Sequence, residues 1–382
     1  MNLLAKSLSA LAVIAVFSST KPETKPVKPM EVPPYKIQVA ILLDVSGSME
    51  GLIDQAKTQL WNMVNTLGKA ECNNNTKPQI ELALYEYGRT NNDQGKGYVK
   101  QLSAFTNDLD SVSKILFGLS TDGGDEYCGQ VIYTSMDELK WDAAKESYKV
   151  IFIAGNEDFL QGNVKYTQAC TKAKEKNIIV NTIYCGDYQS GIAEHWNLGG
   201  ECSNGNFMNI DQNAKEKDIP TPYDQTLVTL NEKLNSTYIG YGATGAANIA
   251  RQGEVDKMNS GTMNGYVSRA NAKAQSNVYN NASWDLVDAS KADSAYFLKI
   301  DKNTLPDSLK NKSTEQLKKI VKEKATERGA IQSEIITVNA NRSRFIAEEK
   351  AKASTNKAAA TLETAVEKTI KEQVQRYNMR IN

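Results

Sequence analysis

The stretch VAILLDVSGSM, residues 39–49, decides the fold. Five apolar residues run without a break up to Asp44, which is typical of a strand buried on both faces of a sheet. A polar loop follows, and apolar residues then recur at helical spacing between Ile53 and Leu67. This order predicts a mostly parallel, doubly wound sheet flanked by helices. Ligands of such sheets gather at the carboxyl ends of the strands, where Asp44 lies.

The alternation of strands and helices continues to about residue 234. The pattern predicts further strands at 80–87, 98–102, 148–154, 178–184 and 207–210. Helices are predicted at 109–116, around 131–139, at 168–176 and at 223–234. We expect the last of these helices to close an α/β domain that spans residues 35–241.

The segments before this domain have other compositions. A lysine, the apolar run Leu8 to Phe17 and small residues after it indicate a signal peptide at 1–19. The apolar run is shorter than the about 20 residues of a membrane-spanning helix. Residues 20–34 contain five prolines and are expected to form a stiff linker. The chain is therefore expected to be exported to the periplasm, cell surface or medium, without a transmembrane segment after cleavage.

The segments after the domain are less uniform. Residues 242–312 are rich in Ala, Asn, Ser and Lys and predict few regular elements, so we describe them as an irregular or mixed extension. Residues 313–382 predict an α-helical C-terminal region, either a hairpin or one long helix. Ser313 and Gln316 form a capping-box pattern at its start. We expect its apolar stripe to pack against the chain's own fold.

The overall charge excludes one class of partner. Basic and acidic side chains number 45 each, so nothing favours binding to nucleic acid or to an anionic membrane. In an oxidising compartment the five cysteines can form disulfides, with at least one left unpaired within the chain. Their spacing does not favour a zinc site. They are Cys72, Cys128, Cys170, Cys185 and Cys202.

The first loop carries the chemistry. Asp44, Ser46 and Ser48 occupy alternate positions and offer one carboxylate and two hydroxyls, a hard, oxygen-rich set that suits Mg²⁺, or Ca²⁺ or Mn²⁺. The alternative is a surface turn that merely caps the next helix. We expect this loop to lie outside the core, so that substitutions in it change the free energy of unfolding by under about 1 kcal/mol.

Residues 39–49 resemble the first strand and the metal-ion-dependent adhesion site of the von Willebrand factor type A family, which includes the integrin inserted domains. The resemblance extends over residues 35–241. It implies that Asp44, Ser46 and Ser48 are metal ligands from the first of three loops. It also implies a second loop that supplies Thr or an acid and a third that supplies Asp. A protein ligand that offers a carboxylate would complete the metal site.

The second loop of the resemblance falls on residues 120–129, STDGGDEYCG. The position after the paired glycines, usually Thr in the family, is Asp125. We therefore take Asp125 as the first candidate ligand of this loop and Thr121 as the second. The alternative is that these are solvated loop residues.

The third loop falls on residues 153–158, IAGNED, where the family often has Thr-Asp-Gly. The usual Asp position falls on Gly155 or Asn156. Glu157 or Asn156 would then contact the metal only through water, which places the metal affinity in doubt rather than the fold.

A disulfide between Cys128 and Cys185 is one expectation from this layout. Cys128 follows the second loop and Cys185 ends a predicted strand, so both are expected at the metal-bearing edge of the sheet. Such a bridge would restrain the loop that carries Asp125.

Enzymatic functions are disfavoured. An aspartyl-phosphate mechanism at Asp44 usually needs a second carboxylate two residues later, where Ser46 stands. A hydrolytic triad would need His195, the only histidine, and no Gly-x-Ser-x-Gly motif precedes it. We expect no catalytic activity.

Two hypotheses about function remain. The first is a secreted or envelope protein that binds or adheres to other proteins through a divalent metal. The alternative is a structural or assembly scaffold of the cell envelope with a vestigial metal site. The residues do not indicate the partner or the oligomeric state.

Overall fold

A central sheet positions the loop that the sequence singles out. The computed structural model describes residues 35–211, 218–293, 296–353 and 362–381, so the predicted signal peptide (1–19) and linker (20–34) lie outside the described residues. Strand β1 (Lys36–Asp44) pairs on one side with β3 (Gln79–Tyr87) and on the other with β5 (Tyr148–Gly155), both in parallel. β1 is therefore a central strand of a parallel sheet, the position in which both faces are usually buried under helices, as the uninterrupted apolar run predicts.

The described part of the sheet has six strands in the order β4-β3-β1-β5-β6-β7. All neighbours are parallel except β3 and β4, which are antiparallel. The prediction of a mostly parallel α/β sheet is therefore confirmed. The remaining strands of this sheet are β4 (Lys100–Thr106), β6 (Ile179–Cys185) and β7 (Phe207–Ile210).

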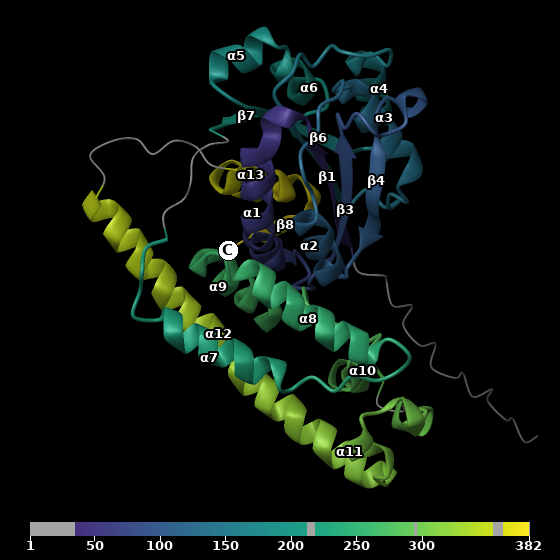
Figure 1. Ribbon diagram of the computed structural model, residues 1–382, viewed down its shortest axis with the longest axis vertical. Helices are drawn as coiled ribbons and strands as arrows, with labels where there is room; N and C mark the ends of the chain where they lie inside the picture. Colours follow the sequence, from purple (N-terminus) through teal and green to yellow (C-terminus); the bar gives the residue numbers. More distant parts are fainter. Residues whose placement is uncertain (1–34, 212–217, 294–295, 354–361, 382) are drawn as a thin grey trace, which may run out of the picture. The chain divides into compact units, whose positions relative to one another are not determined.

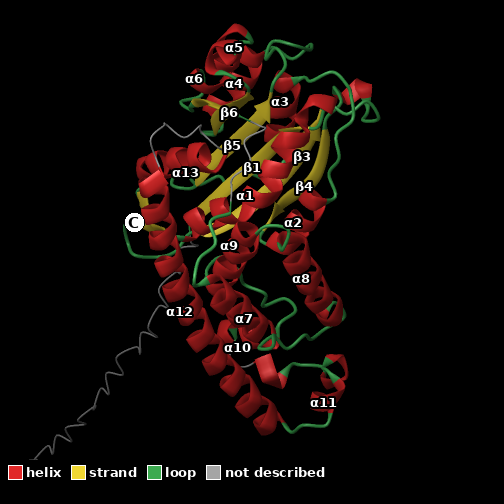
Figure 2. Ribbon diagram, turned by 60° about the vertical axis from the view of Figure 1, so that its left-hand side comes forward, coloured by secondary structure: helices red, strands yellow, loops and turns green. Residues whose placement is uncertain are grey.

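Helices cover both faces of the sheet (Figure 2). Alternate residues of β1 explain the two layers, because Val39 and Leu43 belong to one buried cluster whereas Ala40 and Leu42 belong to the other. Helices α1 (Glu50–Gly68) and α2 (Leu109–Phe117) contribute to the first cluster. Helices α3 (Cys128–Glu138) and α4 (Tyr166–Glu175) contribute to the second. Two shorter helices lie between β6 and β7 in the chain: α5 (Tyr188–Ala193) and α6 (Trp196–Glu201).

The helix that completes the first layer comes from the C-terminus. Helix α13 (Leu362–Gln373) packs against α1 and β7, and its Val366 and Ile370 are buried in the same cluster as Val39. The helix expected at 223–234 is α7 (Asp224–Asn235), which packs mainly against α12 (Thr314–Ala353) and α9 (Met263–Ala274). Its Leu227, Leu230 and Leu234 are buried in the same cluster as Val39. Figure 1 shows α7 alongside α12. Periodicity identifies a helix but not the surface on which it packs.

Residues 242–312 contain more regular structure than the sequence predicts. Their helices bury polar residues, and α9 for example buries Arg269, Asn271 and Lys273, so no apolar stripe marks them. These helices are α8 (Gly245–Asn259), α9, α10 (Leu286–Ala292) and α11 (Asp307–Lys310). Short 3₁₀ helices span Gly47–Met49, Gln94–Lys96, Tyr296–Leu298, Lys302–Thr304 and Val374–Tyr377.

A buried ionic network joins the helices after residue 223 to the sheet layer. Arg269 of α9 forms ion pairs with Asp110 of α2, at 2.6 Å, and with Asp256 of α8. Lys273 is fully buried and lies 3.0 Å from Asp256. The Arg269 guanidinium also lies over the Trp61 ring of α1, 4.7 Å from its centroid. Charges this deep are tolerated because each has an opposite charge as partner.

The C-terminal region is two helices, α12 and α13, in the described residues. The predicted capping box begins α12, because Gln316 N–H donates to Ser313 Oγ at 3.2 Å and Ser313 N–H donates to Gln316 Oε1 at 2.8 Å. The expectation that the apolar stripe packs on the chain's own fold is confirmed, since Leu317 and Ile335 of α12 are buried. The chain then forms β8 (Met379–Ile381), which pairs antiparallel with β2 (Ala70–Cys72).

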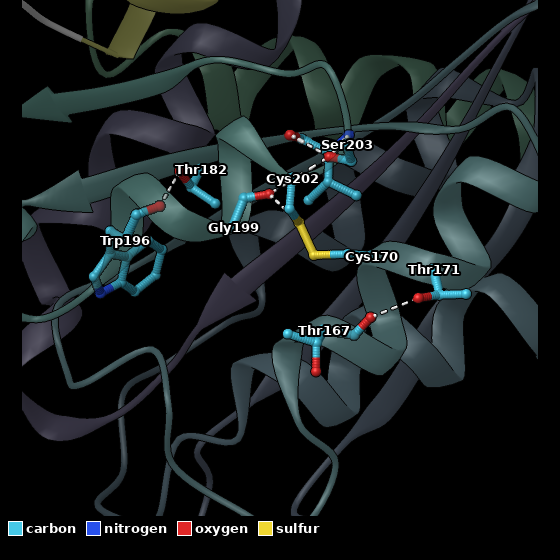
Figure 3. The surroundings of a disulfide bond; sticks show 9 residues. Thr167, Cys170, Thr171, Thr182, Trp196, Gly199, Cys202 and Ser203 are labelled. Carbon is cyan, nitrogen blue, oxygen red and sulfur yellow. Dashed lines mark hydrogen bonds between the residues drawn. A yellow bond between two sulfur atoms is a disulfide. The ribbon is translucent and has the colours of Figure 1, made fainter.

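The disulfide prediction is wrong. Cys170 of α4 is bonded to Cys202 at the end of α6, with 5.7 Å between their Cα atoms (Figure 3). Cys128 and Cys185 are free and buried, and so is Cys72. Cys128 Sγ instead lies 3.8 Å from the Tyr87 hydroxyl. Residues at the same edge of a sheet need not have side chains directed at one another, and the sequence does not determine that direction.

Among the described helices, none is long and apolar enough to cross a bilayer.

Candidate metal centre

Asp44 is fully buried at the carboxyl end of β1. Its Oδ1 accepts a hydrogen bond from the Ser46 backbone N–H at 2.7 Å, and Val45 N–H donates to Tyr87 O at 3.0 Å, which holds the loop against β3. Asp44 Oδ2 is buried and has no hydrogen-bond partner among the described residues. The expectation that the loop lies outside the core is therefore wrong for Asp44. A buried carboxylate oxygen without a partner is costly, which suggests a ligand of its own.

The two serines and Asn156 present further oxygens beside Asp44. Ser46 Oγ and Ser48 Oγ lie 3.3 Å apart. Ser48 Oγ also donates to Asn156 Oδ1 at 3.3 Å, so the third predicted loop meets the first. Ser46 is buried, whereas Ser48 is exposed and accessible to a partner. The structure thus brings Asp44, Ser46, Ser48 and Asn156 together.

The second loop approaches the first through its backbone. Asp122 N–H donates to Val45 O at 2.8 Å. Asp125, the first candidate ligand of this loop, is exposed and accepts a hydrogen bond from the Tyr127 hydroxyl at 3.1 Å. Thr121 is half-buried. In the described residues, neither side chain hydrogen-bonds to the serines or to Asp44.

Glu126 is the acid that this loop directs inward, and the sequence analysis missed it. Its side chain is buried, although both neighbours along the chain are more exposed. Gly88, after β3, explains how closely it approaches Asp44. A Cβ atom at Gly88 would lie 2.9 Å from Glu126 Cγ and 3.0 Å from Asp44 Oδ1. Gly88 also has a φ of +81°, a conformation that favours glycine. The adjacent acids Asp125 and Glu126 were the available signal, but the sequence does not tell which one points inward.

The third loop places a glycine where the family often has an acid. A Cβ at Gly155 would lie 3.0 Å from Asp44 Oδ2 and 2.6 Å from the Tyr87 hydroxyl, so no side chain fits there. Glu157 is exposed, and its backbone carbonyl accepts a hydrogen bond from Trp196 Nε1 at 2.7 Å. The Glu157 carboxylate is near enough to Asp44 for its negative charge to raise the pKa of Asp44.

Both buried acids hold their protons unusually strongly. Burial raises the pKa of Asp44 to about 7; hydrogen bonds from Ser46 oppose this, and the charge of Glu157 reinforces it. Burial also raises the pKa of Glu126 to about 8, with further increases from the charges of Asp44 and Glu157. The site therefore disfavours the ionised form of both acids, and a bound cation would favour it by neutralising their charge.

The donor atoms fit a hard divalent cation. Asp44, Glu126, the two serines and Asn156 offer only oxygens, the ligands that Mg²⁺, Ca²⁺ and Mn²⁺ prefer. Within the described ranges, no three side chains among His, Cys, Asp and Glu form a metal-binding group. A cation at this position would therefore depend on the serine hydroxyls and the asparagine amide as well as on the acids.

His195, considered above for a hydrolytic triad, lies apart from these oxygens. Its Nδ1 is 3.0 Å from Asp158 Oδ1, and both side chains are well exposed.

The chain is similar in structure to von Willebrand factor type A domains. The SpRpn10 VWA domain shares 15% identity over 46% of this chain and 88% of its own, with a TM-score of 0.34. An aerotolerance-related membrane protein from Bacteroides fragilis has 14% sequence identity, and the match covers 46% of this chain and 92% of that protein, with a TM-score of 0.33. The pilus adhesin SpaC from Lactobacillus rhamnosus GG has 12% sequence identity, and the match covers 47% of this chain and 28% of the adhesin, with a TM-score of 0.35.

No protein-family model matches the sequence, and no curated protein matches it significantly. At TM-scores this low the structural similarities carry no argument about function, which rests instead on the geometry of the site.

Proposed function

We propose that this protein binds other proteins through a divalent metal ion held at the carboxyl end of β1. The observation that carries the proposal is Asp44 Oδ2, a buried carboxylate oxygen that has no hydrogen-bond partner among the described residues. Asp44 lies beside the hydroxyls of Ser46 and Ser48. Glu126 and Glu157 repel the negative charge of the Asp44 carboxylate, so a divalent cation stabilises this oxygen better than a water molecule does.

Each residue of the site makes a different contribution to cation binding. Asp44 supplies the main charge, Ser46 and Ser48 supply neutral oxygens, and Asn156 orients Ser48. Mg²⁺, Ca²⁺ or Mn²⁺ fits this set, and the exposed Ser48 marks the side from which a partner can approach. A carboxylate of the partner would be attracted to the bound cation. The protein acts by binding and has no catalytic role, and its place is outside the cytoplasm, as the signal-like residues 1–19 suggest.

A scaffold of the cell envelope is the second candidate, and the buried ionic network favours it. The helices after residue 223 are fixed to α2 and α1 through Arg269, so they form a rigid surface that needs no metal. In this alternative the metal site is vestigial.

Titration calorimetry with Mg²⁺ discriminates the two. We expect the wild-type chain to bind one Mg²⁺ and Asp44→Asn to lose binding, while Asp125→Asn, a matched change of an exposed acid, keeps it. Partner proteins that co-purify in Mg²⁺ should be released by a chelator. Absence of Mg²⁺, Ca²⁺ and Mn²⁺ binding to the folded wild-type chain would leave the scaffold function as the better account.

A further inference from the structure

Glu126 differs from Asp125 and Glu157, the exposed acids near the candidate metal centre, because its side chain is buried. Asp125 is exposed and accepts a hydrogen bond from the Tyr127 hydroxyl, which holds it at the surface. Tyr127 itself packs against the segment that follows the third loop, since a Cβ at Gly162 would lie 2.7 Å from its ring. With its two neighbours fixed in this way, Glu126 is turned inward and only 7% exposed.

Gly88 leaves room for the Glu126 side chain close to Asp44, and the two carboxyl groups influence each other electrostatically. The missing side chain at Gly88 leaves one small space bordered by Glu126 Cγ and by Asp44 Oδ1, each within 3.0 Å of where a Cβ would lie. Two buried carboxyl groups so near to each other repel when both are ionised. Asp44 Oδ2, buried and without a partner among the described residues, independently indicates that a ligand belongs here.

We propose that Glu126 is a built-in carboxylate ligand of the metal, standing in the place that a partner's carboxylate would take. This inference rests on the proposed function. Two carboxylates, Asp44 and Glu126, would balance the charge of a divalent cation, so the free protein would hold the metal in a neutral site. A third carboxylate adds excess negative charge, and partner binding therefore exchanges Glu126 for the partner's acid. The affinity for partners is set by how readily the second loop releases Glu126.

Mn²⁺ and acetate are the probes that test this exchange. Mn²⁺ binding is measured by its paramagnetic resonance signal, and the water molecules on bound Mn²⁺ by proton relaxation. In wild-type protein we expect few exchangeable waters on Mn²⁺ and little response to millimolar acetate. Glu126→Gln should weaken Mn²⁺ binding about tenfold or more, because ligand charge governs the affinity of such sites. It should also raise the relaxation by bound Mn²⁺, and acetate should then lower it again.

Asp125→Asn is the matched control, since it removes the adjacent acid from the surface, and it should behave as wild type in all three measurements. Glu126→Asp, which keeps the charge but shortens the reach, should resemble Glu126→Gln in hydration and serves if the glutamine variant does not fold. If the wild type binds Mn²⁺ and both Glu126 variants match the wild type in affinity, hydration and acetate response, this inference alone is overturned. A wild-type chain that binds no Mn²⁺ overturns the proposed function and this inference with it.

Discussion

Gln373 of α13 and Asn181 of β6 exchange two side-chain hydrogen bonds across 192 residues of sequence. Gln373 Nε2 donates to Asn181 Oδ1 at 2.7 Å, and Asn181 Nδ2 donates to Gln373 Oε1 at 3.1 Å. The Tyr148 hydroxyl also donates to Gln373 Oε1, at 2.8 Å. Because all three side chains are buried, a shift of α13 along the sheet would leave several polar groups unpaired. This arrangement fixes the C-terminal helix in one register on the sheet.

The C-terminal helix is therefore expected to contribute to the stability of the whole sheet. Ile370→Ala removes a fully buried side chain between α13 and the sheet and should lower the free energy of unfolding by about 2–4 kcal/mol. Ile336→Ala on α12 removes a side chain that is 46% exposed and should change it by less than about 1 kcal/mol. Urea unfolding measures both. If both variants changed the free energy of unfolding by the same small amount, the placement of α13 would be contradicted.

The buried ionic network makes a second prediction. Arg269→Met leaves Asp110 without its basic partner in a buried site and should destabilise the protein by about 3–5 kcal/mol. Lys114→Met breaks an ion pair of α2 with Glu254 of α8, but that pair is half-exposed and should be worth under about 1 kcal/mol. Thermal unfolding of both variants, at one pH and salt concentration, tests the contrast. A loss of the same size in each would argue against the network.

The cysteines give a third prediction. Peptide mapping under non-reducing conditions should find Cys170 joined to Cys202 and the thiols of Cys72, Cys128 and Cys185 free. Replacing both bonded cysteines by serine should cost about 2–4 kcal/mol, since the bridge closes a loop of 32 residues. A Cys128–Cys185 peptide in the map would contradict the structure.

Much of the fold could be predicted from the sequence because its signals are local. The apolar run that ends at Asp44 predicts a buried strand whatever surrounds it, and the strands predicted at 80–87, 148–154, 178–184 and 207–210 match those observed. The strand predicted at 98–102 overlaps only the start of β4, and β2 was not predicted. Two kinds of feature could not be predicted. The helices in 242–312 bury Arg269 and Lys273 through ion pairs, which periodicity does not register. That α13 packs on α1 and β7, whereas α7 packs mainly on α12 and α9, depends on contacts far apart in the chain.

The candidate site shows the same division. Asp44, Ser46 and Ser48 lie together because they are close in sequence, and their arrangement was expected. Glu126 lies close to Asp44 because Gly88, directly after another strand, leaves space for both side chains. The inward direction of one acid and the outward direction of its neighbour is a property of the folded loop, so the sequence favoured Asp125.

Metal binding is expected to depend on pH. The pKa of Asp44 is raised to about 7 and that of Glu126 to about 8, so both are largely protonated at pH 6 in the metal-free protein and a cation must displace these protons. The Mg²⁺ affinity should therefore rise by about tenfold or more between pH 6 and pH 8.5. Glu126→Gln removes one of these protons and should flatten the dependence. An affinity that does not change over this range would exclude both groups as ligands.

The most direct test of the metal site compares Asp44→Asn with wild type in thermal or urea unfolding at pH 8, with and without Mg²⁺. Because the pKa of Asp44 is raised from 3.8 to about 7 in the folded protein, its contribution to stability is greatest below pH 4 and is lost as the pH rises through 7. At pH 8 the buried charge then costs on the order of 4 kcal/mol in the metal-free protein. We predict that Asp44→Asn is more stable than wild type in chelator and that saturating Mg²⁺ stabilises only the wild type. Equal stabilisation of both proteins by Mg²⁺, or of neither, would contradict a metal site at Asp44.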